Sequence, residues 1–118
     1  MTVRECYESV GSDFDGVLSR LGSEAIIKKF AVKFLKDTNF YDLGEAIQEQ
    51  DGERAFRAAH TIKGVCLNLG FDRLYEVTAD LTERLRGRDV SGCGPYYEKV
   101  KERYEELRAA LEKLAMEE

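Results

Sequence analysis

Apolar residues recur at intervals of three and four along nearly the whole chain, the spacing that places them on one face of an α-helix. No segment shows the alternation typical of a β-strand. Glycines and short polar residues divide the pattern into segments. Helices are predicted over residues 2–10, 12–22, 23–38, 40–50, 51–70 and 71–86, and from Pro95 onward. Amphipathic helices with short connections predict an all-α antiparallel bundle.

The predicted ends of these helices rest on capping residues. Ser12 and Ser23 precede apolar periodic segments and are expected to act as N-caps, and Asp51 is expected to do so for the segment that ends at Gly70. Pro95 is expected at the first position of the last helix, where its missing N–H costs nothing.

Composition narrows the class of protein. The 118 residues suit one domain over 1–118, and the net charge of −5 argues against a nucleic-acid partner. No apolar run approaches the ~20 residues of a membrane span, and the first residues lack the apolar stretch of a secretory signal. Three cysteines without a CxxC pair fit reduced thiols, so we expect a cytoplasmic protein without a structural metal site.

The one histidine of the chain, His60, lies within the stretch "AAHTIKGVCLNLG" at residues 58–70. Winding this helix at about 100° per residue places His60 opposite the apolar face. Its neighbours on the outer face are Phe56, Lys63, Gly64 and Leu67. The face predicted to be buried comprises Ala55, Ala58, Ile62, Val65, Cys66 and Leu69.

These neighbours suit an imidazole that carries a phosphoryl group. A neutral ring nitrogen is a nucleophile that can attack phosphorus, and Lys63 could offset the charge of the phosphoryl oxygens. Gly64 costs the helix about 1 kcal/mol relative to alanine, which suggests an access position for a second protein. Phe56 and Leu67 on an otherwise polar face suggest a partner-docking surface. A surface histidine without a function is the alternative interpretation.

The same stretch resembles the A-H-T-L-K-G-x-x-x-N-L-G signature of histidine-containing phosphotransfer (HPt) domains. The similarity is strongest over residues 51–87 and weaker over 11–50 and 95–115. It implies a four-helix bundle, to which the apolar pattern of the first residues adds short N-terminal helices. It further implies His60 as phosphoacceptor, Lys63 as charge support and Gly64 as the access position. Val65 departs from the small polar residue that many members carry there, which we interpret as a packing variation at the edge of the core.

What the resemblance implies in function is a phosphorelay module. Such a module takes a phosphoryl group from a receiver-domain aspartate and passes it to another receiver, with a hybrid histidine kinase as a possible further partner. Mg²⁺ would be supplied by the receiver. The chain has no glycine-rich phosphate loop, so we expect a phosphoryl carrier without autonomous kinase activity and without a cofactor or metal of its own. If their helix borders the His60 face, Lys29, Lys33 and Lys36 would complement an acidic receiver surface.

Two other functions remain open from sequence. The chain could be the phosphoacceptor domain of a chemotaxis-type histidine kinase, phosphorylated by an ATP-binding domain. It could instead be a helical adaptor in which His60 is incidental. The initial methionine and the polar end "MEE" favour a small stand-alone protein, and an outer face suited to transient contact favours a monomer.

Overall fold

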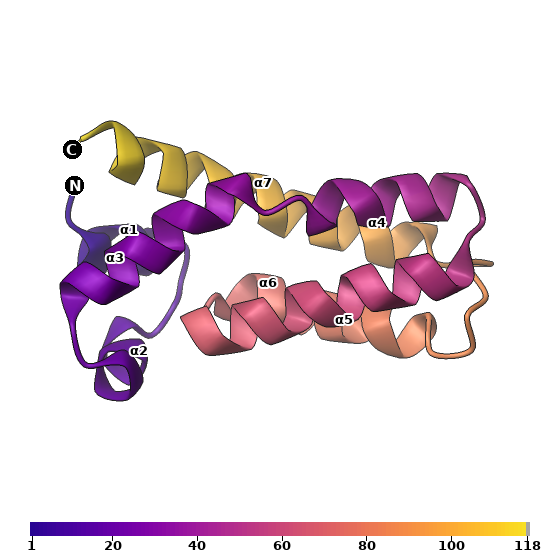
Figure 1. Ribbon diagram of the computed structural model, residues 1–118, viewed down its shortest axis with the longest axis horizontal. Helices are drawn as coiled ribbons and strands as arrows, with labels where there is room; N and C mark the ends of the chain where they lie inside the picture. The colour runs from indigo at the N-terminus through magenta and orange to yellow at the C-terminus, as the bar shows by residue number, and fades with distance from the viewer. Residues whose placement is uncertain (118) are drawn as a thin grey trace.

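The computed structural model describes residues 1–117, which form helices and contain no strand (Figure 1). The expected domain boundary at residue 118 lies outside the described residues. The elements are α1 (Val3–Ser9), α2 (Phe14–Leu21), α3 (Glu24–Lys33), the 3-10 helix η1 (Phe34–Lys36), α4 (Asn39–Gln48), α5 (Gly52–Leu69), α6 (Asp72–Arg84) and α7 (Gly94–Met116).

Helices α4 to α7 form an antiparallel four-helix bundle in which each helix packs beside the next along the chain (Figure 1). Short connections join α4 to α5 and α5 to α6, whereas residues 85–93 form a longer loop before α7. The predicted bundle with additional short N-terminal helices is therefore confirmed. Among residues 1–117, no helix has the length and apolar character needed to cross a bilayer.

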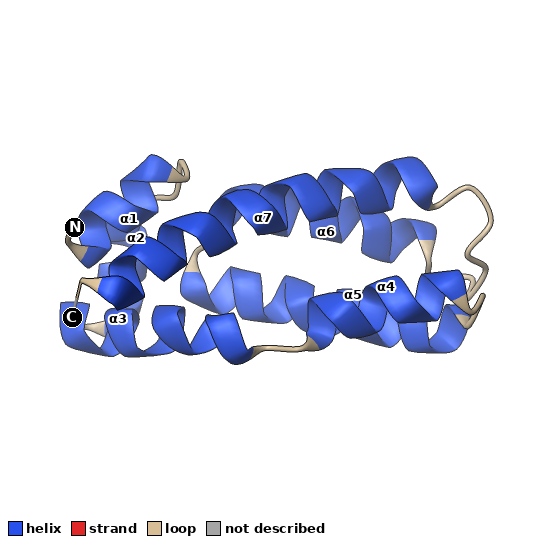
Figure 2. Cartoon of the chain, turned by 90° about the horizontal axis from the view of Figure 1, so that it is seen from above, coloured by secondary structure: helices blue, strands red, loops and turns tan. Residues whose placement is uncertain are grey.

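The three N-terminal helices gather at one end of the bundle, where both termini lie (Figure 2). Helix α7 has 23 residues, and at 1.5 Å per residue it is about 35 Å long, enough to extend past the bundle. Helices α1 and α3 pack on this extension. The bundle and the N-terminal helices thus share one long helix.

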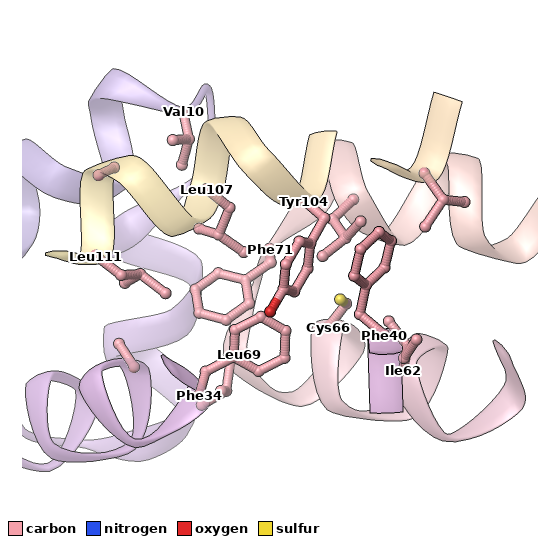
Figure 3. Packing of buried hydrophobic residues seen from close by; sticks show 14 of the residues in the cluster. Val10, Phe34, Phe40, Ile62, Cys66, Leu69, Phe71, Tyr104, Leu107 and Leu111 are labelled. Atoms are coloured by element: carbon pink, nitrogen blue, oxygen red, sulfur yellow. The ribbon is translucent and has the colours of Figure 1, made fainter. Parts of the chain in front are cut away.

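Aromatic rings fill the core where the N-terminal helices meet the bundle (Figure 3). The ring of Phe34 lies 5.3 Å from that of Phe71 and 6.1 Å from that of Tyr104, measured between centroids. Phe40 of α4 stacks on Tyr104 of α7 with the centroids 4.0 Å apart. Cys66 of α5 is buried beside these rings. The core therefore holds the histidine helix against both parts of the molecule.

Helix ends follow the predicted caps with two differences. The side chain of Ser23 accepts a hydrogen bond from the N–H of Ile26, as expected. The N-cap of α2 is Asp13 and not Ser12, because the carboxylate of Asp13 accepts from the N–H of Gly16 while Ser12 is buried before the helix. Helix α7 begins one residue earlier than predicted, so that Pro95 is its second residue.

Candidate functional site

Helix α5 carries His60 near its middle and holds it on the solvent side. Asp51 starts the helix as predicted, accepting a hydrogen bond of 3.1 Å from the N–H of Arg54, and Gly70 ends it in the left-handed conformation with φ 72°. His60 itself is exposed. The opposite face is buried and comprises Ala55, Ala58, Ala59, Ile62, Cys66 and Leu69. Burial of this face fixes the rotation of the helix and therefore the outward direction of the imidazole.

Gly64 leaves open space one helical turn from His60. A Cβ atom added there would meet no atom within 4 Å outside its own stretch of helix. Other glycines near the helix ends differ, since an added Cβ would come within 1.8 Å of the Arg88 carbonyl oxygen at Gly52 and within 2.1 Å of Val17 at Gly70. Packing therefore explains the glycines at the ends of α5 and does not explain Gly64.

Lys63 lies between helix α6 and the histidine face of α5, by which we mean the outer side that carries Phe56, His60, Gly64 and Leu67. Its side chain is half-buried, and its charge acts on Glu83 near the end of α6. A hydrogen bond from Arg86 is the main reason why the pKa of Glu83 lies below its usual range, and the ammonium of Lys63 contributes less. Lys63 thus lies one turn from His60 and close to the carboxylate of Glu83, which is paired with Arg86.

Phe56 is less exposed than the sequence suggested. Its ring is half-buried against the core and stacks with the His60 ring at 8°, with the centroids 5.9 Å apart. The guanidinium carbon of Arg88 lies 3.8 Å from the Phe56 centroid. Much of the Phe56 ring is therefore covered by contacts within the chain, and its docking to a partner stays a prediction. Leu67 is 55 % exposed and remains a candidate for docking.

An apolar groove of about 650 Å³ lies on the side of α5 away from α6. Its walls come from α2, α3, η1 and the C-terminal half of α5. Val65, Asn68 and Leu69 form the α5 wall. At about 100° per residue, Asn68 lies about 80° and Val65 about 140° around the helix axis from His60, so the groove runs along the side of α5 beyond the histidine. The half-buried Val65 thus lies at the edge of the core, as predicted. The lining residues are Arg20, Leu21, Phe30, Lys33, Phe34, Lys36, Asp37, Val65, Asn68 and Leu69.

Only part of the predicted lysine stripe lies at the groove. Lys33 and Lys36 line the groove, whereas Lys29 is exposed elsewhere on α3. Arg20 adds a third cation and donates to the main-chain carbonyl oxygens of Leu67 and Asn68 at 3.4 Å each. The groove accordingly combines an apolar floor that includes Phe30 with a mostly basic rim.

Sequence reasoning missed the residues that α6 and its following loop bring to the site. Glu83, Arg86 and Arg88 surround Phe56 and Lys63, yet the segment was interpreted only as the end of a helix and a loop. A signal was present, because α5 and α6 pair as an antiparallel hairpin about Gly70. Counting outward from that turn places the arginine-rich stretch "RLRGRD" beside the residues just before His60.

Besides His60, the side chains of the described residues that could bind a metal or act as nucleophiles do not cluster at one place. Within the described range, no group of three or more His, Cys, Asp and Glu residues is placed to hold a metal ion. Cys6, Cys66 and Cys93 are all buried as free thiols. Burial raises the pKa of Cys6 to about 11 and raises that of Cys66 further. A thiol with so high a pKa is a poor nucleophile at neutral pH.

Comparison with protein families places the chain in one of them. The family model described as Hpt domain matches residues 37–114, which is well over half of the chain. The chain therefore belongs to the Hpt domain family, whose members are phosphocarrier modules of phosphorelay signalling and interact with receiver domains and histidine kinases. Searches of curated proteins and of solved structures returned no match.

Proposed function

We propose that this chain is a phosphorelay intermediate that accepts a phosphoryl group on His60 from the aspartate of one receiver domain and passes it to another. The observation that carries this proposal is an exposed imidazole with Lys63 and Gly64 about one turn away. A cation is available on one side of the ring, and open space is available beside it.

The transfer requires one bond to form as another breaks. A neutral His60 ring nitrogen attacks the phosphorus of the receiver's aspartyl phosphate, the P–N bond forms, and the P–O bond to the aspartate breaks to release its carboxylate. Lys63 offsets the charge of the phosphoryl oxygens while the P–N bond forms and the P–O bond breaks. The receiver's own carboxylates would hold Mg²⁺, which would neutralise charge on the same oxygens from the partner's side. Transfer to the next receiver reverses these steps.

The groove beside the histidine face supports a docking role. A receiver that places its aspartate against His60 would lie over Gly64, Leu67 and the edge of the groove. The basic rim with Lys33 and Lys36 complements an acidic partner surface, and exposed apolar groups such as Leu67 supply contact area. The half-buried Phe56 contributes less to this surface than its sequence position suggested. Since the proposed donors and acceptors are signalling proteins of the cytoplasm, we place the chain there as well.

A receiver-transfer assay tests this proposal. The full chain and a His60→Gln variant are incubated with a phosphorylated receiver domain and, separately, with the catalytic core of a histidine kinase and ATP. We expect rapid labelling of the wild-type chain by the receiver, none of the variant, and nearly equal melting temperatures, because His60 is exposed. Labelling only by the kinase core would instead identify a chemotaxis-type phosphoacceptor domain, and no labelling by either would identify a helical adaptor.

A further inference from the structure

We infer that Phe56 and Arg88 are positioning residues that hold the His60 ring in one orientation for phosphoryl transfer. This inference rests on the proposed function and assigns a role to a loop residue far from His60 in sequence. Arg88 lies over the Phe56 ring at 3.8 Å, and that ring stacks with the imidazole at 8°. The three side chains form a continuous series of contacts from the loop after α6 to the reactive ring.

Arg88 is fixed from its backbone outward. Its φ is 60°, one of two positive values among the described non-glycine residues. Its carbonyl lies so close to Gly52 that a Cβ there would come within 1.8 Å of the oxygen. The first residue of α5 and the loop after α6 therefore interlock, and this contact sets where the Arg88 side chain begins.

The side chain of Arg88 is held by polar contacts as well. Its Nε donates a hydrogen bond of 3.0 Å to Glu53, and its Nη1 donates to the carbonyl of Arg86. The bond from Arg88 is the largest cause of the lowered pKa of Glu53. These contacts direct the guanidinium to the Phe56 ring, where it interacts with the π-electrons.

Phe56 transmits this restraint to His60. Residues four apart on a helix are neighbours, and the two rings lie nearly parallel. An exposed histidine without such a neighbour would sample several χ1 rotamers, and only some would direct a nitrogen along the line of attack on phosphorus. A stacked Phe56 reduces this freedom before the partner arrives. Phe56 lies one turn before His60 and Gly64 one turn after it, so the stacked ring leaves the Gly64 side of the imidazole open.

The single histidine makes this positioning directly measurable. We compare the wild-type chain with Phe56→Leu, Arg88→Met, Phe56→Tyr and the matched control Arg57→Met, whose arginine is exposed on the same helix and also pairs with Glu53. NMR couplings that report χ1 of His60 are the first measurement. We expect one rotamer in the wild type, Phe56→Tyr and Arg57→Met, and averaged couplings in Phe56→Leu and Arg88→Met.

Phosphorylation rates are the second measurement, taken with phosphoramidate as a small donor and with a phosphorylated receiver. Because misplaced reacting groups slow attack, we expect Phe56→Leu and Arg88→Met to be about tenfold slower with both donors. Phe56→Tyr and Arg57→Met should stay within about twofold of the wild type with phosphoramidate, since both keep an aromatic ring at position 56 and Arg88 over that ring. Melting curves identify any variant that has lost its fold.

Two results would overturn the inference. One is a single His60 rotamer in Phe56→Leu and Arg88→Met, and the other is an unchanged phosphoramidate rate in a folded Phe56→Leu variant. Failure of the proposed function has a different signature, which is a wild-type chain that takes no phosphoryl group from a receiver. In that case the χ1 couplings still decide whether Phe56 and Arg88 orient the ring.

Discussion

The hydroxyl of Tyr7 donates a buried hydrogen bond of 2.7 Å to the main-chain carbonyl of Leu69. This bond links α1 to the last residue of the histidine helix across 62 positions of sequence. A carbonyl at the end of a helix lacks a partner within the helix, so Tyr7 satisfies a group that would otherwise be buried and unpaired. The N-terminal helices are thereby fixed to α5 as well as to α7.

Replacing Tyr7 with Phe should lower the free energy of unfolding by about 1–3 kcal/mol, because the Leu69 carbonyl loses its partner while the ring packing is kept. Urea unfolding measures this change. Phosphoryl uptake at 20 °C should be unchanged, since His60 lies more than two turns away from Leu69. A variant as stable as the wild type would show that water satisfies the Leu69 carbonyl equally well.

Replacing Gly64 with Gln should separate stability from access. Glutamine is a far better helix former than glycine, so the helix should gain about 0.5–1 kcal/mol in stability. The new side chain would occupy the open space beside His60, and transfer to and from a receiver should slow at least about tenfold, which corresponds to ~1.4 kcal/mol in the barrier. Thermal melts and transfer rates measure the two effects. A stabilised variant that transfers at the wild-type rate would refute the role of Gly64 in access.

Removal of the Lys63 charge should act on the phosphoryl group and not on the fold. Lys63→Ala should change the free energy of unfolding by less than about 0.5 kcal/mol. Transfer should slow by roughly tenfold, because an ammonium close to the phosphoryl oxygens is lost. Lys63→Arg keeps the charge and serves as the control, with a smaller loss. Equal rates for the alanine variant and the wild type would mean that Lys63 is an ordinary surface residue.

Charge removal from the groove rim should slow the encounter with a receiver. The double variant Lys33→Gln/Lys36→Gln should reduce the association rate several-fold at low salt, and this difference should shrink as salt screens the charges. Lys99→Gln/Lys101→Gln removes the same charge from exposed positions of α7 and is the matched control. Stopped-flow measurements over a salt series compare the variants. Equal association rates for the two double variants would show that the groove takes no part in receiver docking.

Alkaline pH should weaken the fold through the buried thiols. An unfolded cysteine has a pKa of about 8.5, whereas burial raises the pKa of Cys6 to about 11. Between these values the folded state holds a proton that the unfolded state releases, so stability is complete below the lower value and declines as pH rises toward the upper one.

Urea unfolding at several pH values measures this decline. The free energy of unfolding should fall less steeply with pH in Cys6→Ala than in the wild type, whatever the substitution costs at neutral pH. Parallel pH profiles for the two proteins would show that the Cys6 thiol ionises alike in the folded and unfolded states.

The sequence predicted the helices and the direction of His60 because both follow from local periodicity. The spacing of Ala58, Ile62 and Cys66 determines which side of α5 is buried, and the outer face follows from that choice. Gly64 was recognisable from the sequence because a glycine lowers the stability of a helix and no helix end or turn requires one at this position. These inferences need only one helix, which explains why they agree with the structure.

Contacts between helices do not follow from the periodicity of one helix: the pairing of α5 with α6 places the arginine-rich stretch near Phe56 but does not select the residue that touches its ring. The apolar character of Phe56 gave no sign that Arg88 would cover its ring, since that contact depends on a loop backbone with positive φ and on its close approach to Gly52. The prediction of Ser12 as the N-cap of α2 was also wrong. Ser12 and Asp13 are both good N-cap residues, and only the burial of Ser12 in the folded protein decides between them.

The groove beside the histidine face draws its two long walls from different parts of the chain. One wall is the end of α5, inside the matched residues 37–114, and the other is α2, α3 and η1, which precede them. The proposed docking surface thus draws on both stretches of sequence, whereas the proposed reactive residues His60, Lys63 and Gly64 all lie on α5. Under the proposed function, substitutions in the first 36 residues would change which receiver binds while His60, Lys63 and Gly64 stay the same, so related proteins would differ in partner and share one chemistry.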